Sequence, residues 1–169
     1  MMEFNLMTIP LQKNSKFKQG FYHPRNPDKL IGYDVPAYRS SIELEFMKWC
    51  DNNDKVIKWG SECVKVPYKD TAQRKDRLYF VDNYVEILEG DKVKKYLIEL
   101  KDIKETQKPD PRSKKKKATL LSEQFRWQNN TDKWKYAIKY ARDRNMEFLL
   151  LGHSKKEGFV PVNLNFLIH

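Results

Sequence analysis

The chain has 169 residues, with 33 Lys or Arg and 23 Asp or Glu, which gives a formal net charge of +10. This length suits one ordinary domain, and a composition of 40% hydrophobic and 13% aromatic residues argues against wholesale disorder. A pI near 9.5 favours a polyanionic partner. Nucleic acid ranks ahead of an anionic membrane, because the sequence has no amphipathic anchor or lipidation motif.

Missing motifs argue against several other classes of protein. No apolar run approaches the ~20 residues of a membrane span, and the opening segment is too short and polar for a signal peptide, so we expect an intracellular protein without a membrane partner. Cys50 and Cys63 form no CxxC pair and the three histidines have no ligand spacing, which disfavours disulfide scaffolds and zinc ribbons. The absence of a Walker motif disfavours a motor or a kinase.

In chain order, residues 1–37 mix basic residues with prolines and predict an extended basic N-terminal arm. A helix is predicted over about 41–52, because Ser40 and Glu43 fit a capping box and apolar residues then recur at helical spacing. From residue 56 onward, β-branched and aromatic residues alternate with period two, which is typical of strands. The predicted strands are 56–59, 63–68, 78–88 and 93–101.

The last third of the chain is predicted to be mainly helical. Residues 102–118 contain prolines and a lysine run, which predicts a basic loop. Two helices are expected at 119–128 and 132–144, and a final strand at 147–151. The fold class is therefore α/β, with one mixed, twisted sheet built around the hairpin 78–101 and helices packed against it.

Two acidic residues face each other in this predicted hairpin. If Gly90 and Asp91 form a two-residue type II′ turn, the paired positions sum to 181, and Asp82 lies opposite Glu99. Like charges placed directly opposite each other are destabilising unless a positive charge lies between them. Lys101 follows Glu99 by two residues and points to the same face of the strand. The pattern predicts two carboxylates and an amine at one place.

Glu43 can add a third carboxylate, because it borders the apolar stripe of the helix 41–52. Oxygen ligands around a cation that keeps some of its waters describe a Mg²⁺ site, and such an ion can activate water against a phosphodiester. Lys101 can stabilise the developing oxyanion. A simpler interpretation stays open, in which Glu43 only caps its helix and the strand acids pair with neighbouring Lys or Arg side chains.

Five segments resemble, in order and spacing, the head completion nucleases of tailed bacteriophages. They are Tyr38–Glu43, Trp59–Glu62, Arg77–Asp82, Tyr96–Lys101 and Asn130–Trp134. The strand Asp followed by Glu-Leu-Lys also resembles the PD-(D/E)xK nuclease signature, with Val81 in place of proline. The phage family is itself similar to the endonuclease subunit of a cut-and-paste transposon. Ile42 departs from the family, which often has Trp there.

The resemblance implies a restriction-endonuclease-like domain over 38–152, followed by a tail, 153–169, whose role it leaves open. It implies a Mg²⁺-dependent deoxyribonuclease of the endonuclease type, with Mn²⁺ as a substitute metal. The implied catalytic residues are Glu43, Asp82, Glu99 and Lys101, and the implied metal ligands are Asp82, Glu99 and Glu43. The implied partners are DNA and other head or neck proteins, in the host cytoplasm during virus assembly or in the virion.

A basic run and one arginine are the candidate DNA-binding residues. They are Arg39, Lys114, Lys115, Lys116 and Lys117. A solvated loop and a structural ion pair are the alternatives for them. Two other functions compete with the nuclease: a non-catalytic virion protein that binds DNA ends, and a transposition endonuclease subunit. The intact candidate site argues against the first, and the short chain leaves little room for the partner-binding domain of the second.

Overall fold

A five-stranded mixed sheet forms the centre of the computed structural model, which describes residues 19–168. The strand order is β3–β6–β7–β8–β9, and every neighbouring pair is antiparallel except β7–β8, which is parallel. The strands are β3 (Val56–Ser61), β6 (Asn83–Glu89), β7 (Lys92–Asp102), β8 (Glu147–Ser154) and β9 (Gly158–Pro161). A parallel pair needs a long crossover, and the helix α2 (Lys117–Arg142) lies within it.

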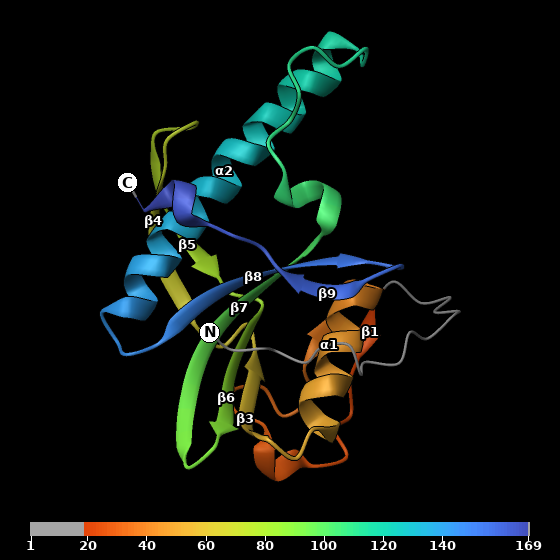
Figure 1. Cartoon of the computed structure of the whole chain (residues 1–169), viewed down its shortest axis with the longest axis vertical. Coiled ribbons are helices and arrows are strands. Elements are labelled where there is room, and N and C mark those ends of the chain that lie inside the picture. The colour runs from red at the N-terminus through yellow and green to blue at the C-terminus, as the bar shows by residue number, and fades with distance from the viewer. Residues whose placement is uncertain (1–18, 169) are drawn as a thin grey trace.

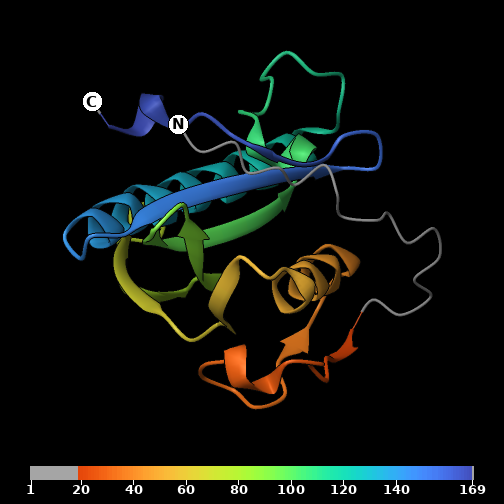
Figure 2. The ribbon, with the colours of Figure 1, turned by 60° about the horizontal axis from the view of Figure 1, so that its bottom comes forward.

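The two α-helices within residues 19–168 cover opposite faces of this sheet, as Figures 1 and 2 show. Successive residues of β7 divide between the two faces. Ile98 and Leu100 pack in one buried cluster with α1 (Ser41–Asn52), whereas Leu97 packs in a second cluster with α2. The predicted α/β fold, a mixed sheet flanked by helices, is therefore confirmed.

The β6–β7 hairpin has the predicted register. Its pairs run from Glu89 with Lys92 to Asn83 with Ile98, and each sums to 181. Gly90 has a φ of 63°, as the first central residue of a type II′ turn requires.

A second hairpin, β4 (Lys65–Asp70) and β5 (Lys75–Phe80), forms a separate two-stranded sheet. The single strand predicted over 78–88 is therefore wrong, because the chain changes sheets at Val81 and Asp82. Val81 N–H donates to the Val64 carbonyl at 3.1 Å, while the Asp82 carbonyl accepts from Glu62 N–H at 3.1 Å. Asp82 consequently lies at the corner between the hairpin and the central sheet.

The helix α2 is continuous, so the predicted break between 128 and 132 is wrong. Polar residues at the expected break bond to the β4–β5 hairpin. Asp132 accepts hydrogen bonds from the Thr71 amide and hydroxyl, at 2.9 and 2.7 Å, and Asn129 donates to the Tyr68 hydroxyl at 3.1 Å. These tertiary contacts offset the low helix propensity of the residues that make them.

The described part of the predicted N-terminal arm lies against the domain, whereas its residues 1–18 lie outside the described residues. β1 (Gly20–Phe21) pairs with β2 (Ala37–Tyr38), the short helix η2 (Pro27–Lys29) lies between them, and Ile31 N–H donates to the Trp59 carbonyl at 2.9 Å. Two further short helices are η3 (Ile103–Thr106) and η4 (Asn165–Leu167). Within residues 19–168, no helix is long and apolar enough to cross a membrane.

Candidate active site

Asp82 and Glu99 approach each other at the end of the β6–β7 hairpin. The last ladder pair joins Asn83 to Ile98, so Asp82 is the next residue beside Glu99. The Asp82 carboxylate accepts a hydrogen bond from Leu100 N–H at 2.8 Å, which fixes it against β7. Since Leu97 packs toward α2, Glu99 and Lys101 point to that same face of the sheet.

Burial and like charge act together on Asp82. Burial raises the pKa of its carboxyl well above the usual range, and the negative charge of Glu99 raises it further. The Leu100 N–H and the Lys101 ammonium act in the opposite direction but do not outweigh these effects. Glu43 also raises this pKa, so its charge lies within electrostatic reach of Asp82. The site therefore concentrates more negative charge than its own donors neutralise.

Glu99 is held from two sides. Its side chain is only 4% exposed; the Tyr79 hydroxyl donates to one carboxylate oxygen, and the Lys101 ammonium lies 3.2 Å from the other. Burial works against the charged form of Lys101, but the carboxylates of Glu99 and Asp82 outweigh it and raise the Lys101 pKa. Lys101 is therefore a charged amine at neutral pH, and its side chain is 25% exposed.

Glu43 and Arg39 lie at the start of α1. Ser40 is the N-cap, and its hydroxyl accepts from Glu43 N–H at 3.2 Å. The Glu43 carboxylate accepts from Arg39 N–H at 2.7 Å, so the predicted cap is confirmed. The Arg39 guanidinium pairs with Glu62 at 3.0 Å, and its side chain is 67% exposed. Glu62 in turn donates its N–H to the Asp82 carbonyl, which links the cap to the carboxylate corner.

The donors at this corner are carboxylate oxygens, the kind of ligand that Mg²⁺ prefers. Among residues 19–168, no three His, Cys, Asp or Glu side chains form a group that could hold a metal ion. Mg²⁺ is usually bound through one or two carboxylates, with waters and substrate phosphates at its other positions. Asp82 and Glu99 supply that number of carboxylates, and their crowded charge favours a cation beside them. The assignment of Glu43 as a third ligand stays a prediction.

Comparison with known proteins shows the family to which the chain belongs. Residues 53–152 match the family model described as TnsA-like endonuclease N terminal. The chain belongs to this family. It is also 37% identical over 136 residues to the head completion nuclease of Enterobacteria phage T4, which covers 78% of this chain and 89% of that protein. No solved structure matches the chain.

The family match confirms the resemblance found in the sequence, and it spans Asp82, Glu99 and Lys101 but not Glu43 or Arg39. The cap of α1 therefore lies outside the matched segment, whereas the carboxylate pair lies inside it.

Sequence reasoning missed two residues of the site, Tyr79 and Lys133. Tyr79 is buried on β5 and bonds Glu99, although its strand belongs to another sheet. Lys133, on α2, places its ammonium 5.5 Å from the centre of the Tyr79 ring. Burial lowers the Lys133 pKa, and the nearby Lys101 charge lowers it further, against the effect of Glu99. Lys133 lies in the segment Asn130–Trp134 that resembled the phage family, and that was its one signal in the sequence.

The predicted basic run lies at the N-terminal end of α2, which projects away from the sheet in Figure 1. Lys117 begins the helix, Lys116 is its N-cap, and Lys115 pairs with Glu123 at 2.6 Å. A helix rises 1.5 Å per residue, which separates Lys117 from Lys133 by about 24 Å along the axis. The structure therefore places the run away from the carboxylates, on a projection of its own.

Proposed function

We propose that this chain is a Mg²⁺-dependent deoxyribonuclease that acts during phage head completion, in the infected host cell. The observation that carries the proposal is the pair of half-buried Asp82 and buried Glu99 with Lys101 beside it, in a chain of the TnsA-like endonuclease family. The name of the T4 relative, head completion nuclease, supports both the chemistry and the biological setting. DNA is then the substrate, and head or neck proteins are the candidate partners.

Asp82 and Glu99 would hold the metal ion, Mg²⁺ or Mn²⁺ in its place, with Glu43 bordering the site from α1. The bound cation would supply Lewis-acid stabilisation of the phosphate and lower the pKa of water. Tyr79 keeps Glu99 in place through its hydroxyl, and Leu100 N–H does the same for Asp82. Lys101, charged and partly exposed, would donate to the oxyanion that develops on the phosphate.

Cleavage assays with matched variants test the proposal. Linear, nicked and branched DNA are incubated with Mg²⁺ or Mn²⁺ and with wild type, Asp82→Asn, Lys101→Met or Lys95→Met, the last being an exposed lysine on the same strand. Asp82→Asn should cut on the order of 1,000-fold more slowly, because metal charge stabilisation is worth several kcal/mol. Lys101→Met should lose most cutting but keep metal binding, and Lys95→Met should cut like wild type.

Two results would contradict the proposal. If the pure wild-type protein cuts none of these substrates, a non-catalytic protein that binds DNA ends becomes the better hypothesis. If Asp82→Asn and Lys101→Met both cut as well as wild type, the chemistry does not occur at this site.

DNA binding by the projecting lysines is a separate part of the proposal. Each phosphate that a lysine neutralises releases counterions, so affinity falls as salt rises. Replacing Lys114–Lys117 with alanine should weaken DNA binding. It should also make the slope of log affinity against log salt concentration shallower, by the amount that up to about four phosphate contacts contribute. Fluorescence titrations across a salt series measure this slope. An unchanged slope would show that these lysines are only solvated.

A further inference from the structure

A polar cavity lies beside the candidate active site, between the β4–β5 hairpin and α2. Its volume is about 510 Å³, within the range of about 300–1,000 Å³ typical of small-molecule sites. Tyr68, Asp70 and Arg77 line it from the hairpin, and Asn129 and Lys133 line it from the helix. Of these five residues only Lys133 also lies beside the carboxylate site, and the other four take no part in it, so the cavity is an additional feature.

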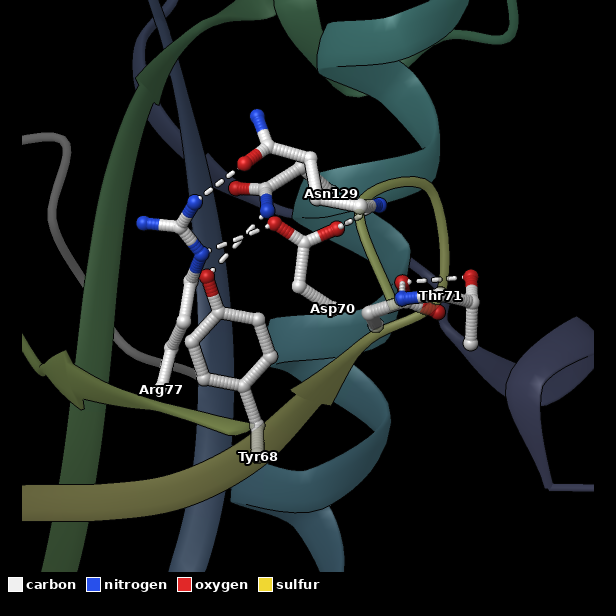
Figure 3. Close-up of polar contacts among 7 residues, drawn as sticks. Tyr68, Asp70, Thr71, Arg77 and Asn129 are labelled. Atoms are coloured by element: carbon white, nitrogen blue, oxygen red, sulfur yellow. Dashed lines mark hydrogen bonds and ion pairs between the residues drawn. The ribbon is translucent and has the colours of Figure 1, made fainter. Parts of the chain in front are cut away.

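Contacts within the protein hold the polar groups of the cavity wall in place before any ligand binds. The Arg77 guanidinium is 3.0 Å from the carboxylate of Asp70, whose side chain is 3% exposed, and it also donates to Gln73. Figure 3 shows Arg77 and Asp70 pointing toward each other, with the Asn129 amide directed at the Tyr68 hydroxyl. The hairpin turn is tied to the helix through Thr71. A ligand would therefore meet a cavity whose polar groups are already oriented.

The charge of the cavity suits a single phosphodiester. Arg77 and Lys133 contribute two positive charges and Asp70 one negative charge, which leaves a net charge of +1. The contacts to Asp70 and Gln73 use two of the five N–H donors of the guanidinium, so Arg77 has further donors. Leu78, 55% exposed, adds an apolar surface at the rim, beside the hydroxyl and amide groups.

Lys133 connects the cavity to the carboxylate site. It lines the cavity, and its ammonium lies 5.5 Å from the centre of the Tyr79 ring, whose hydroxyl bonds Glu99. A strand whose phosphate reached Asp82 and Glu99 would thus have a neighbouring nucleotide at the cavity.

The size of the cavity excludes a duplex. A volume of about 510 Å³ equals a cube with an edge of roughly 8 Å, whereas a B-DNA duplex is wider than its own major groove, which is ~12 Å across. One nucleotide taken out of the helix is a smaller object, and enzymes that act on such nucleotides hold the base by hydrogen bonds and by contact with apolar or planar side chains.

We propose that this cavity binds one unpaired nucleotide of the DNA strand, with its phosphate at Arg77 and Lys133 and its base at Leu78, Tyr68 and Asn129. The inference rests on the proposed function and narrows it to DNA that carries an unpaired nucleotide at or next to the cut. A fully paired duplex would leave the cavity empty and lose those contacts.

Binding assays in EDTA test this without any cleavage. The probes are a blunt duplex and the same duplex with a short single-stranded extension at either the 5′ or the 3′ end, carrying 2-aminopurine in the extension. Since a hydrogen bond to a charged group is worth about 1.5–3 kcal/mol, wild type should bind one of the extended probes about 10- to 150-fold more tightly than the blunt one. The 2-aminopurine emission should change when that probe binds.

Two variants alter the cavity in different ways. Lys133→Met removes a charge but keeps most of the side-chain length, and Asn129→Leu replaces the polar amide with an apolar side chain of similar size. Both should reduce the preference for the extended probe to near unity while thermal melts show a folded protein. Lys135→Met, an exposed lysine on the same helix, should keep the wild-type preference. Deoxynucleoside monophosphate should compete only weakly with the extended probe.

The possible failures can be told apart. Equal wild-type affinity for all probes, or a preference that survives both cavity variants, overturns the unpaired-nucleotide site even if the protein cuts DNA. Binding of the free mononucleotide as tight as that of the extended probe also overturns it. A preference that the cavity variants remove, in a protein that cuts nothing, supports the site and contradicts the nuclease proposal alone.

Discussion

Two aspartates, Asp51 and Asp82, have the same side chain but opposite pKa shifts in this fold. Asp51, fully buried at the end of α1, accepts hydrogen bonds from the Tyr22 hydroxyl and from the N–H groups of Arg25 and Asn26, at 2.7 to 2.9 Å. Burial alone would raise the Asp51 pKa, but these bonds outweigh it and lower the pKa. Asp82 receives one such bond within residues 19–168, from Leu100, and its pKa rises.

The difference separates a structural acid, Asp51, from the acid proposed to be functional, Asp82. At Asp51 the donors match the charge, so the carboxylate fastens the segment before η2 to the helix end. At Asp82 a second carboxylate, Glu99, lies close by and the donors do not balance the charge. Folding thus leaves a local excess of negative charge where the proposed cation would bind, at a cost to the stability of the metal-free protein.

Removing the structural acid should have the largest effect. Asp51→Ala leaves three donors without an acceptor, and each orphaned buried donor costs about 1–3 kcal/mol, so the free energy of unfolding should fall by about 3 kcal/mol or more. Urea denaturation measures this change. Asp143→Ala, at the exposed end of α2, is the control and should shift stability by about 0.5 kcal/mol or less. If the free energy of unfolding hardly changes in Asp51→Ala, Asp51 is not a structural acid.

The pH dependence of that effect should have a definite sign. Because the pKa of Asp51 is lower in the folded than in the unfolded state, its stabilisation is present above the ordinary value near 3.8 and is lost as pH falls through the folded pKa. The stability difference between wild type and Asp51→Asn should therefore be full at pH 7 and shrink below about pH 4. Denaturation curves at several pH values measure it, and a difference that grows on acidification would contradict the assignment.

The pH dependence of stability should have the opposite sign at Asp82, the acid proposed to be functional. Since the pKa of Asp82 is raised, its ionisation destabilises the fold as pH rises above the ordinary value. Asp82→Asn keeps an acceptor for Leu100 N–H and removes the repulsion, so it should stabilise the metal-free protein by about 1 kcal/mol at pH 7. The gain should vanish in acid, where the wild-type carboxyl is protonated. A loss of stability at pH 7 would contradict this.

The smallest effect is expected at Tyr79, which positions Glu99. Tyr79→Phe should cost about 1 kcal/mol of stability and slow cleavage about 10-fold, since partners of metal ligands typically contribute 10- to 100-fold. A merely structural role would leave the Mg²⁺ dependence unchanged, whereas a positioning role raises the Mg²⁺ concentration needed for half-maximal cleavage. Tyr33→Phe, at an exposed site, should change neither quantity.

The sequence predicts the elements that rest on local or short-range patterns. The β6–β7 register follows from the turn at Gly90, and the start of α1 follows from Ser40. The Asp82–Glu99 pairing follows from that same register. These features depend on spacing within a few residues or across one turn.

Features that rest on distant contacts were not predictable in the same way. The continuity of α2 depends on hydrogen bonds to the β4–β5 hairpin, about sixty residues earlier in the chain. Likewise, the groups that donate hydrogen bonds to Asp51 lie more than twenty residues upstream, so the sequence around Asp51 does not predict them. Tyr79 and Lys133 join the site only because a second hairpin and the crossover helix pack over the same face.

The most direct test is the change in unfolding free energy when Mg²⁺ is added to wild type and to Asp82→Asn. A ligand that binds only the folded state at ten times its Kd stabilises by about 1.4 kcal/mol. Wild type and the control Asp143→Asn should gain stability with Mg²⁺ along the same curve, while Asp82→Asn should gain much less. If Asp82→Asn gains as much as wild type, or if wild type gains nothing at any Mg²⁺ concentration, the carboxylate pair is not the metal site.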